Sequence, residues 1–384
     1  MHVETDRTST SKGLNMRRVP TTFLKPGMCV ARPVYGSAGQ ALLQRNVMLT
    51  HRYISQLKGL GVPFLYIEDG LLDGYRVDDV IADETRAGAV HRVRNLVAAM
   101  ETPNPLAHVL MRTKEVARTV DTIVEELFRQ REIMVNLTDI RLEDDYLFGH
   151  SVNVCVLAII TGIAYGLNKE QLSHLGIGAI MLDVGMSVIP QTILRKPSLL
   201  TVPEFEAVKQ HTTAGYEILT ALPQARDVAH EHHERYDGSG YPQGKKGNQT
   251  QLHAQLVSIC DVYDAVTAVR AHRPAYPPHE ALELIAGSGN RAFPLELIAK
   301  FLENVAAYPT GVVVKFSDNR VGIVVDTPKG LYKYPRVRML YDQQGQPYPA
   351  PYEVSTAEHP TLVVSRILSE AEFSLYRRPK YAQN

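Results

Sequence analysis

Residues 230–242 read HEHHERYDGSGYP, which places three imidazoles within four residues, just before a glycine-rich turn. An isolated histidine on an apolar face is usually a structural residue, but adjacent His232 and His233 followed by Glu234 are typical of metal ligands. Neighbouring helical positions diverge by about 100°, so both histidines can serve one site only at a helix end. The glycines that follow predict that end, because glycine adopts left-handed conformations without steric cost. Amides in such a turn can also point at a phosphate.

The surrounding sequence predicts a mainly α-helical domain over residues 141–308. From about Glu143 to Val305 the pattern stays helical, and only prolines and the glycine-rich loop 237–247 interrupt it. We therefore expect a helical bundle that carries the histidine-rich stretch at a helix end.

The run HHERYDGSGYP is similar to the defining motif of HD-GYP domains, which hydrolyse the bacterial second messenger cyclic di-GMP at a two- or three-metal site in a helical bundle. Other segments agree with this family in the same order along the chain, and the resemblance covers roughly residues 143–310. These segments are His150-Ser151-Val152, Ile189-Pro190, Leu194-Arg195-Lys196-Pro197, Lys209-Gln210-His211 with Gly215-Tyr216, and Asp261-Val262-Tyr263-Asp264-Ala265. The resemblance implies an HD-type bundle with phosphodiesterase activity.

The resemblance also implies a ligand set and a catalytic role for one residue. Asp183 would bridge two metal ions and is the expected catalytic residue, since a two-metal centre activates a hydroxide and neutralises charge on the scissile phosphate. A mixed imidazole and carboxylate set suits a divalent transition metal, and the family favours iron or manganese over zinc. The implied ligands are His150, Asp183, His211, His232, His233 and Asp261.

The sequence departs from the family at the HD signature. The family has His-Asp, a small apolar residue, Gly and Lys, whereas this chain has Leu182 before Asp183 and Met186 in place of the lysine. Leucine cannot ligate a cation, and methionine cannot donate to a phosphate as lysine does. Tyr146 and His230 are candidates to replace the missing imidazole, but a structural role is the favoured interpretation of both.

The loss affects two metal positions unequally. The first metal position keeps only His150, Asp183 and Asp261. The second metal position, formed by Asp183, His211, His232 and His233, keeps four protein ligands, which is enough for one tightly held ion. The sequence thus predicts one or two ions per chain, of which one is bound tightly and the other is readily lost.

Contacts to the cyclic di-GMP substrate are expected from two segments. Gly240, Tyr241 and Pro242 shape the pocket wall in this interpretation. Arg270 and Arg273 follow the Asp261 helix where the family places basic side chains, and a planar guanidinium suits bidentate phosphate contact. A solvated surface charge is the alternative for either arginine.

The rest of the chain predicts a small α+β module before the bundle and a short β appendage after it. Residues 1–18 form a disordered extension in this interpretation, and translation could begin at Met16. Short β-type runs and a helix at 51–60 predict an α+β regulatory module over 19–72. Residues 73–140 predict a helical linker, which either pairs with a second copy in a homodimer or lies solvated. Residues 309–384 predict the β appendage and tail.

Composition limits the class of protein. The 41 basic and 41 acidic residues cancel, so net charge predicts no general attraction to nucleic acid or to an anionic membrane. The three cysteines form no CxxC pair, which favours a reducing cytoplasm. The apolar stretch 152–167 is short and interrupted, so we expect a buried helix and no membrane span.

Two functions are consistent with these observations. The first is metal-dependent hydrolysis of cyclic di-GMP to the linear dinucleotide or GMP. The second is a catalytically impaired HD-GYP signalling module that binds metal or nucleotide and acts through a protein partner such as a diguanylate cyclase. Leu182 and Met186 favour the second function, and the rest of the site favours the first.

Overall fold

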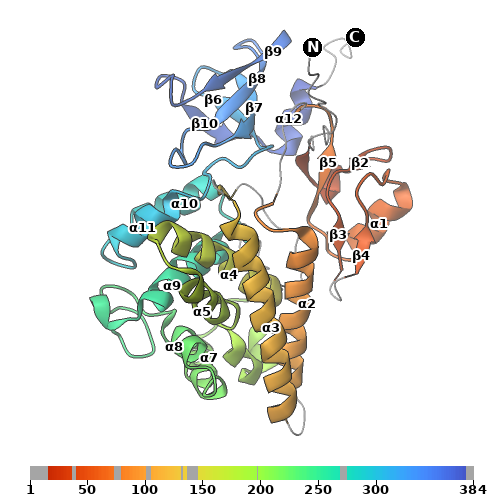
Figure 1. Cartoon of the computed structure of the whole chain (residues 1–384). Helices are drawn as coiled ribbons and strands as arrows, with labels where there is room; N and C mark the ends of the chain where they lie inside the picture. Colours follow the sequence, from red (N-terminus) through yellow and green to blue (C-terminus); the bar gives the residue numbers. More distant parts are fainter. Residues whose placement is uncertain are drawn as a thin grey trace, which may run out of the picture.

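The computed structural model describes residues 16–36, 40–72, 79–100, 105–130, 133–135, 146–196, 198–268 and 275–377. A body of helices carries two small β-containing units at the same end, as Figure 1 shows. One of these units comes from the start of the chain and the other from its end. The described architecture is therefore mainly α, with an α+β module before the bundle and a β unit after it.

The N-terminal module is built on a three-stranded sheet of order β1-β5-β2, with a second two-stranded sheet beside it. β1 (Arg17–Pro20) begins inside the segment expected to be an extension, and it pairs antiparallel with β5 (Phe64–Glu68). One of the β-type runs expected in this module, residues 21–24, does not form a strand: Thr21–Phe23 is the short 3-10 helix η1. The other elements are β2 (Cys29–Val30), β3 (Val34–Tyr35), β4 (Ala41–Leu43) and α1 (His51–Gly59).

The long helices α2 (Asp83–Met100) and α3 (Pro105–Phe128) belong to the bundle. Apolar side chains from both helices, such as Leu96 and Val120, are buried in the same hydrophobic core as α4 and α5. The expected alternative of a solvated linking helix is therefore wrong for the described residues, because their apolar faces are covered by the bundle itself.

The bundle is organised around α4 (Tyr146–Tyr165), in which every residue from 151 to 160 is buried. Among the described residues, Leu147–Tyr165 is the one helical segment apolar and long enough to cross a membrane, yet 72% of it is buried inside the protein, as in a core helix. The other elements are α5 (Lys169–Ile180), η3 (Val184–Val188), α6 (Gln191–Leu194), α7 (Val202–Ile218), α8 (Pro223–Glu231), η4 (Gly247–Gln249), α9 (Leu252–Thr267), α10 (Pro278–Ala286) and α11 (Leu295–Leu302).

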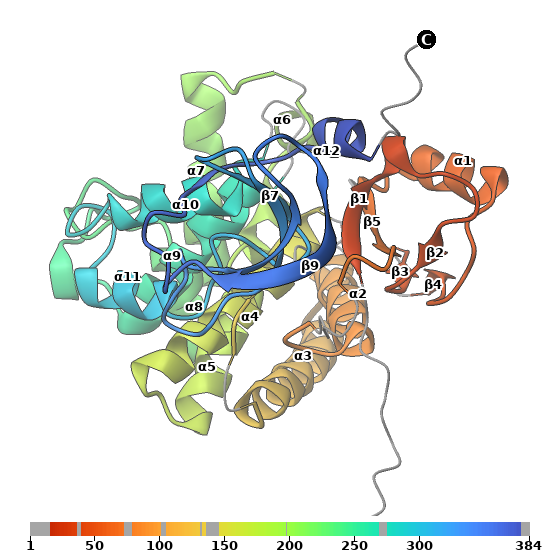
Figure 2. The same ribbon diagram turned by 90° about the horizontal axis from the view of Figure 1, so that it is seen from above.

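The C-terminal unit is a five-stranded antiparallel sheet of order β10-β6-β7-β8-β9 followed by a helix. In the view of Figure 2 this sheet lies over the helical body, beside the N-terminal module. Its elements are β6 (Val313–Phe316), β7 (Val321–Asp326), β8 (Arg336–Tyr341), β9 (Pro347–Ser355), β10 (Val364–Ile367) and α12 (Glu370–Tyr376).

The two small units share a hydrophobic core. Met16 and Phe64 from the N-terminal module pack in one cluster with Val313, Ile323 and Phe373 from the C-terminal unit. Polar contacts reinforce this junction, because Arg17 donates to Asp69 at 2.6 Å and also to Glu370 on α12. The first and last described segments therefore stabilise each other.

Candidate metal centre

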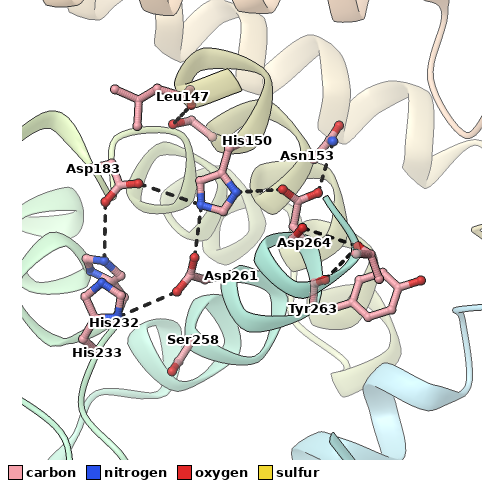
Figure 3. A network of polar contacts seen from close by, with 12 residues as sticks. Leu147, His150, Asn153, Asp183, His232, His233, Ser258, Asp261, Tyr263 and Asp264 are labelled. Atoms are coloured by element: carbon pink, nitrogen blue, oxygen red, sulfur yellow. Dashed lines mark hydrogen bonds and ion pairs between the residues drawn. The ribbon is translucent and has the colours of Figure 1, made fainter. Parts of the chain in front are cut away.

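The structure brings the predicted ligands together from separate elements, as Figure 3 shows for five of them. Four of these residues each offer one ligand atom, and all four atoms lie within 4.8 Å of one another. Those four are Asp183, His211, His232 and His233. His150 from α4 and Asp261 from α9 lie next to this cluster through Asp183 and His233.

A close approach between η3 and α7 positions Asp183. A Cβ atom on Gly185 would lie 2.0 Å from the carbonyl oxygen of His211 and 2.6 Å from the amide nitrogen of Gly215. No side chain fits in that space, so glycine at position 185 allows the two backbones to touch. Asp183, two residues earlier, is thereby held beside the imidazole of His211.

The turn after α8 is held by two buried carboxylates. Glu234 accepts hydrogen bonds from the amides of Gln243 at 2.7 Å and Lys245 at 3.0 Å. Glu231 accepts from the Lys245 ammonium at 2.5 Å. Both carboxylates therefore close the loop, and Glu234, which follows the histidine pair in sequence, does not join the ligand cluster. Gly240 completes the turn, because a Cβ there would lie 2.4 Å from the carbonyl oxygen of His233.

The second metal position has its ligand rings fixed by the backbone. His211 Nδ1 lies 2.7 Å from the Val208 carbonyl oxygen, and His232 Nδ1 lies 3.0 Å from that of Ala229. Each Nδ1 is placed to donate to its carbonyl, which leaves both Nε2 atoms as acceptors. These two atoms are 3.4 Å apart, and Asp183 Oδ1 is 3.5 Å from His211 Nε2.

A cation suits this arrangement, because lone pairs from two imidazoles and a carboxylate converge without a proton between them. Nitrogen ligands at about 2.1 Å from one metal ion lie roughly 3.0 to 3.4 Å apart, which matches the 3.4 Å between the two Nε2 atoms. Burial and the neighbouring His211 lower the pKa of His232 to about 4, so this ring is neutral at pH 7 and available to a metal.

His233 lies on the side of the cluster that faces α9. Its Nδ1 is 3.8 Å from Asp261 Oδ2, and its ring packs against Tyr241 with centroids 4.7 Å apart. Burial and the adjacent His232 hold the pKa of His233 well below its ordinary value. This imidazole is also neutral at pH 7.

The first metal position is held by side chains. His150 Nε2 lies 3.0 Å from Asp261 Oδ1, while His150 Nδ1 lies 2.7 Å from Asp264 Oδ2 (Figure 3). Burial alone would lower the pKa of His150, but hydrogen bonds to the two carboxylates outweigh it and raise that pKa well above 6.5. The raised pKa favours the protonated ring, whose two nitrogens are placed to donate to the two aspartates.

Asp183 faces both positions with different oxygen atoms. Its Oδ1 lies 3.5 Å from His211 Nε2 and 3.8 Å from His232 Nε2, whereas its Oδ2 lies 3.8 Å from His150 Nε2. A carboxylate with one oxygen toward each ligand set has the geometry of a bridging ligand. The arrangement can thus hold two neighbouring cations on either side of one aspartate.

Comparison with known proteins agrees with this geometry. A family model described as an HD domain matches residues 136–293, and one described as a KOW domain associated with HD domain matches residues 313–375. The cyclic di-GMP phosphodiesterase PA4108 of Pseudomonas aeruginosa is 28% identical over 88% of this chain and 88% of its own length. The chain belongs to the HD-GYP family.

Other relatives match shorter parts of the HD-GYP chain. A cyclic di-GMP phosphodiesterase of Thermotoga maritima is 30% identical and covers 57% of this chain and 61% of its own length. The 3'3'-cGAMP-specific phosphodiesterase 1 of Vibrio cholerae is 31% identical over 42% of this chain and 38% of its own. Among solved structures, the HDG"Y"P protein Bd1817 of Bdellovibrio bacteriovorus aligns with a TM-score of 0.47 at 14% identity, covering 74% of this chain and 98% of that one.

The departures from the HD-GYP signature lie beside this centre. Leu182 is completely buried in the main hydrophobic core, and Met186 is half-buried. His230 does not join the ligand cluster; its ring packs against Tyr216 with centroids 4.8 Å apart. Tyr146 begins α4, and its side chain lies outside the described part of the chain. Within that part, no imidazole takes the place of the one missing at position 182.

Only some of the residues expected to contact the substrate lie in the part of the chain that the structure describes. Tyr241 lies beside His233 at the site, while Gly240 is half-buried and Pro242 is exposed in the same turn. Arg270 and Arg273 lie outside the described residues.

Sequence reasoning assigned no role to Asp264 or Asn153, although both support the site. Asp264 accepts from His150, and Asn153 Nδ2 donates to Asp264 Oδ1 at 3.2 Å. The available signal was spacing, because each residue lies three positions after a predicted ligand on the same helix face.

Proposed function

We propose that this HD-GYP protein is a metal-dependent phosphodiesterase that hydrolyses a cyclic dinucleotide, with cyclic di-GMP as the first substrate to test. The observation that carries the proposal is Asp183, whose two oxygens face two separate ligand sets. The names of the relatives support the substrate class, since they are cyclic di-GMP and 3'3'-cGAMP phosphodiesterases. The products expected are the linear dinucleotide or GMP.

The proposed ligand roles follow from the donor atoms available. His211, His232 and His233 would hold the second position together with Asp183, whereas His150 and Asp261 would hold the first position with the same aspartate. Bound cations would lower the pKa of a water molecule and neutralise charge on the phosphate. His150 must release the proton at Nε2 before that nitrogen can bind a metal. Asp264 would keep the proton on Nδ1 and thereby fix the orientation of the ring.

We propose iron or manganese as the metal, because mixed imidazole and carboxylate ligands suit these ions. The second position would retain one ion tightly. The first position would hold a second ion more weakly, since three protein ligands remain there. Tyr241 would form part of the nucleotide pocket, as its ring already covers one side of His233. Gly240, Pro242, Arg270 and Arg273 keep their proposed substrate roles.

The rival proposal is a signalling module without catalysis, and Leu182 is the observation that favours it. The relatives support the enzyme instead, because they are named for their phosphodiesterase activity. A diguanylate cyclase or another signalling protein is the partner proposed in either case. The described cysteines are all free, which supports the reducing cytoplasm as the proposed setting. A homodimer is proposed as the assembly, and light scattering of the full chain tests it.

The deciding experiment combines metal content with turnover. The full chain is purified without oxygen, loaded with Mn²⁺ or Fe²⁺, and analysed for metal per chain; cyclic di-GMP and 3'3'-cGAMP are then supplied and the products separated by chromatography. Hydrolysis by the wild-type protein that is lost in the Asp183→Asn variant supports the proposal that this protein is a phosphodiesterase. A folded, metal-loaded protein that cleaves neither nucleotide contradicts it and favours the signalling module.

A further inference from the structure

A continuous chain of polar contacts leads from the N-terminal module to the metal centre. It begins at Arg32, and the backbone next to Arg32 is fixed to the N-terminal sheet. The amide of Ala31 donates to the carbonyl oxygen of Tyr66 in β5 at 2.9 Å. The Arg32 guanidinium lies 2.5 Å from Asp79 and 2.6 Å from Asp83 at the start of α2. An arginine of the small module is thus anchored to the helix that packs on the bundle.

Arg86 on α2 is the centre of this chain. Its Nε and Nη2 atoms donate to the two oxygens of Asp79 at 3.0 and 3.1 Å, which is a bidentate contact. Its Nη1 atom donates at 2.6 Å to Asn153 Oδ1 on α4. One planar guanidinium therefore joins the carboxylate held by Arg32 to the amide that faces the site.

The last contacts reach a predicted metal ligand. The Asn153 amide can donate to Asp264 only while its oxygen faces Arg86, so this contact fixes which way the amide points. Asp264 then accepts from His150 Nδ1 at 2.7 Å. Because one ring nitrogen is held by Asp264, the other is directed at Asp261 and Asp183. The orientation of His150 depends on every preceding contact.

Burial makes the chain sensitive to the loss of any member. The exposed side-chain fractions are 7% for Arg32 and Asp79, 14% for Arg86 and 5% for Asp264. Water therefore cannot readily replace a missing partner, and a buried charge left alone must move or recruit another group. The Asp79 pKa reflects this balance: burial would raise it, but Arg86 and Arg32 outweigh burial and lower it.

We propose that Arg86 is a positioning residue for His150, and that the chain from Arg32 to Asp264 couples the N-terminal module to the first metal position. This inference rests on the ligand roles proposed above. Any ligand or partner that shifts Arg32 changes the orientation of His150 and so the affinity for the weaker ion. By linkage, binding of that ion stabilises the docked position of the N-terminal module. The second position, whose rings are held by backbone carbonyls, does not respond.

The test uses the full chain and two readouts that need no hydrolysis. The first is Mn²⁺ binding, followed by the electron paramagnetic resonance of free Mn²⁺, which separates tight from weak sites. The second is the imidazole ¹⁵N–¹H resonance of His150 in metal-free protein. Arg86→Met should weaken the second Mn²⁺ about tenfold, as outer-shell changes commonly do, shift the His150 resonance, and leave the tight ion unchanged. Arg32→Met should cause the same changes, smaller in size.

Arg17→Met is the matched control, because Arg17 is also a buried arginine and joins the same module to Asp69 and α12. Within the described part of the structure it makes no contact with the residues that lead from Arg32 to His150. It should leave both readouts unchanged. If Arg86→Met does not fold, Arg86→Lys takes its place, since lysine keeps the charge beside Asp79 but cannot also reach Asn153 as a planar fork.

The proposal is overturned if Arg32→Met leaves the His150 resonance and the weak Mn²⁺ unchanged, or if Arg17→Met changes them equally. If the wild-type protein binds only one Mn²⁺, the imidazole resonance of His150 alone tests the proposal. Wild type that binds metal but cleaves no cyclic dinucleotide contradicts the proposed function and leaves this coupling standing.

Discussion

The two halves of the candidate metal centre are supported in different ways. At the second position, His211 and His232 are oriented by carbonyl groups of their own helices, one turn away. At the first position, His150 is oriented by Asp264, which lies 114 residues later in the chain. Local support is present as soon as a helix forms, whereas support from a distant side chain requires the assembled tertiary structure. The first position is therefore the half that other parts of the molecule can influence.

Charge separates the two halves as well. The pKa of His232 is lowered to about 4 and that of His233 also lies well below its ordinary value, mainly because both rings are buried. His150 is equally buried, yet two carboxylates raise its pKa. In one half, the lowered pKa values of His232 and His233 favour neutral imidazoles that can bind a metal directly. In the other half, the raised pKa of His150 favours a protonated ring, which must lose a proton when a metal binds.

The largest expected effect comes from the residue that both halves share. Asp183→Asn keeps the shape of the side chain but removes the charge and one acceptor oxygen. Hydrolysis should fall by about a thousandfold or more, because stabilisation of both attacking and leaving oxygens is lost. Turnover and metal content measured together check this. Retention of both ions and near-normal turnover would show that Asp183 is not the bridge.

The next effect separates the halves directly. His232→Ala should remove the tightly held ion and lower the melting temperature of the metal-loaded protein by about 5 to 10 °C, since bound metal stabilises the fold by about 3 kcal/mol at a hundredfold excess over the dissociation constant. His150→Ala should leave that ion in place. Elemental analysis measures the metal content of both variants, and calorimetry measures their melting temperatures. Loss of the tight ion in His150→Ala would show that the two metal positions are not independent.

A third change repairs the weaker half. Leu182→His combined with Met186→Lys should bring the metal content toward two ions and raise turnover roughly tenfold to a hundredfold. Since Leu182 is completely buried among apolar residues, the double variant should also lose about 1 to 3 kcal/mol of stability. Chemical unfolding measures that loss. A stable double variant that holds two ions and still cleaves nothing would argue against the hydrolase.

The smallest effect is a difference in pH dependence. The pKa of His150 is raised in the folded protein, so the bound proton stabilises the metal-free fold fully at pH values below 6.5, the ordinary pKa of histidine. This stabilisation is lost as the pH rises through the raised pKa. Affinity for the weaker ion should therefore increase with pH, by about tenfold per unit while one proton is displaced. The contribution of His232 and His233 to the affinity for the tight ion should stay constant from pH 6 to 8, because both rings are already neutral in that range. Calorimetric titrations at several pH values test both slopes.

Sequence reasoning could propose the ligand set because each motif carries its own chemistry, and the structure brings those side chains close together. It could not reach the role of Asp264, since only the fold brings this carboxylate to His150. The helices α2 and α3 show a second limit, because a helical pattern of Val116 and Val120 does not tell whether the apolar face is covered by the bundle or by another copy.

In the C-terminal unit, the strand β9 could not be predicted from the sequence, for a different reason. β9 reads PYPAPYEVS and is almost entirely exposed. An edge strand rich in proline lacks the alternation of apolar residues by which strands are predicted. β6 and β7 form a hairpin and do show the expected pattern, because their apolar residues are buried and flank a clear turn.

The hydrophobic core shared by the first and last described segments has a consequence for biosynthesis. Met16 and Phe64 leave the ribosome early, but their partners Ile323 and Phe373 are made after the entire helical body. The N-terminal module must therefore keep apolar surface exposed until the C-terminal unit has been made, and chains with such exposed surface are prone to aggregate. A chain that terminates before α12 would lack Phe373 and leave part of this surface uncovered, so the truncated protein should be degraded faster than the full chain.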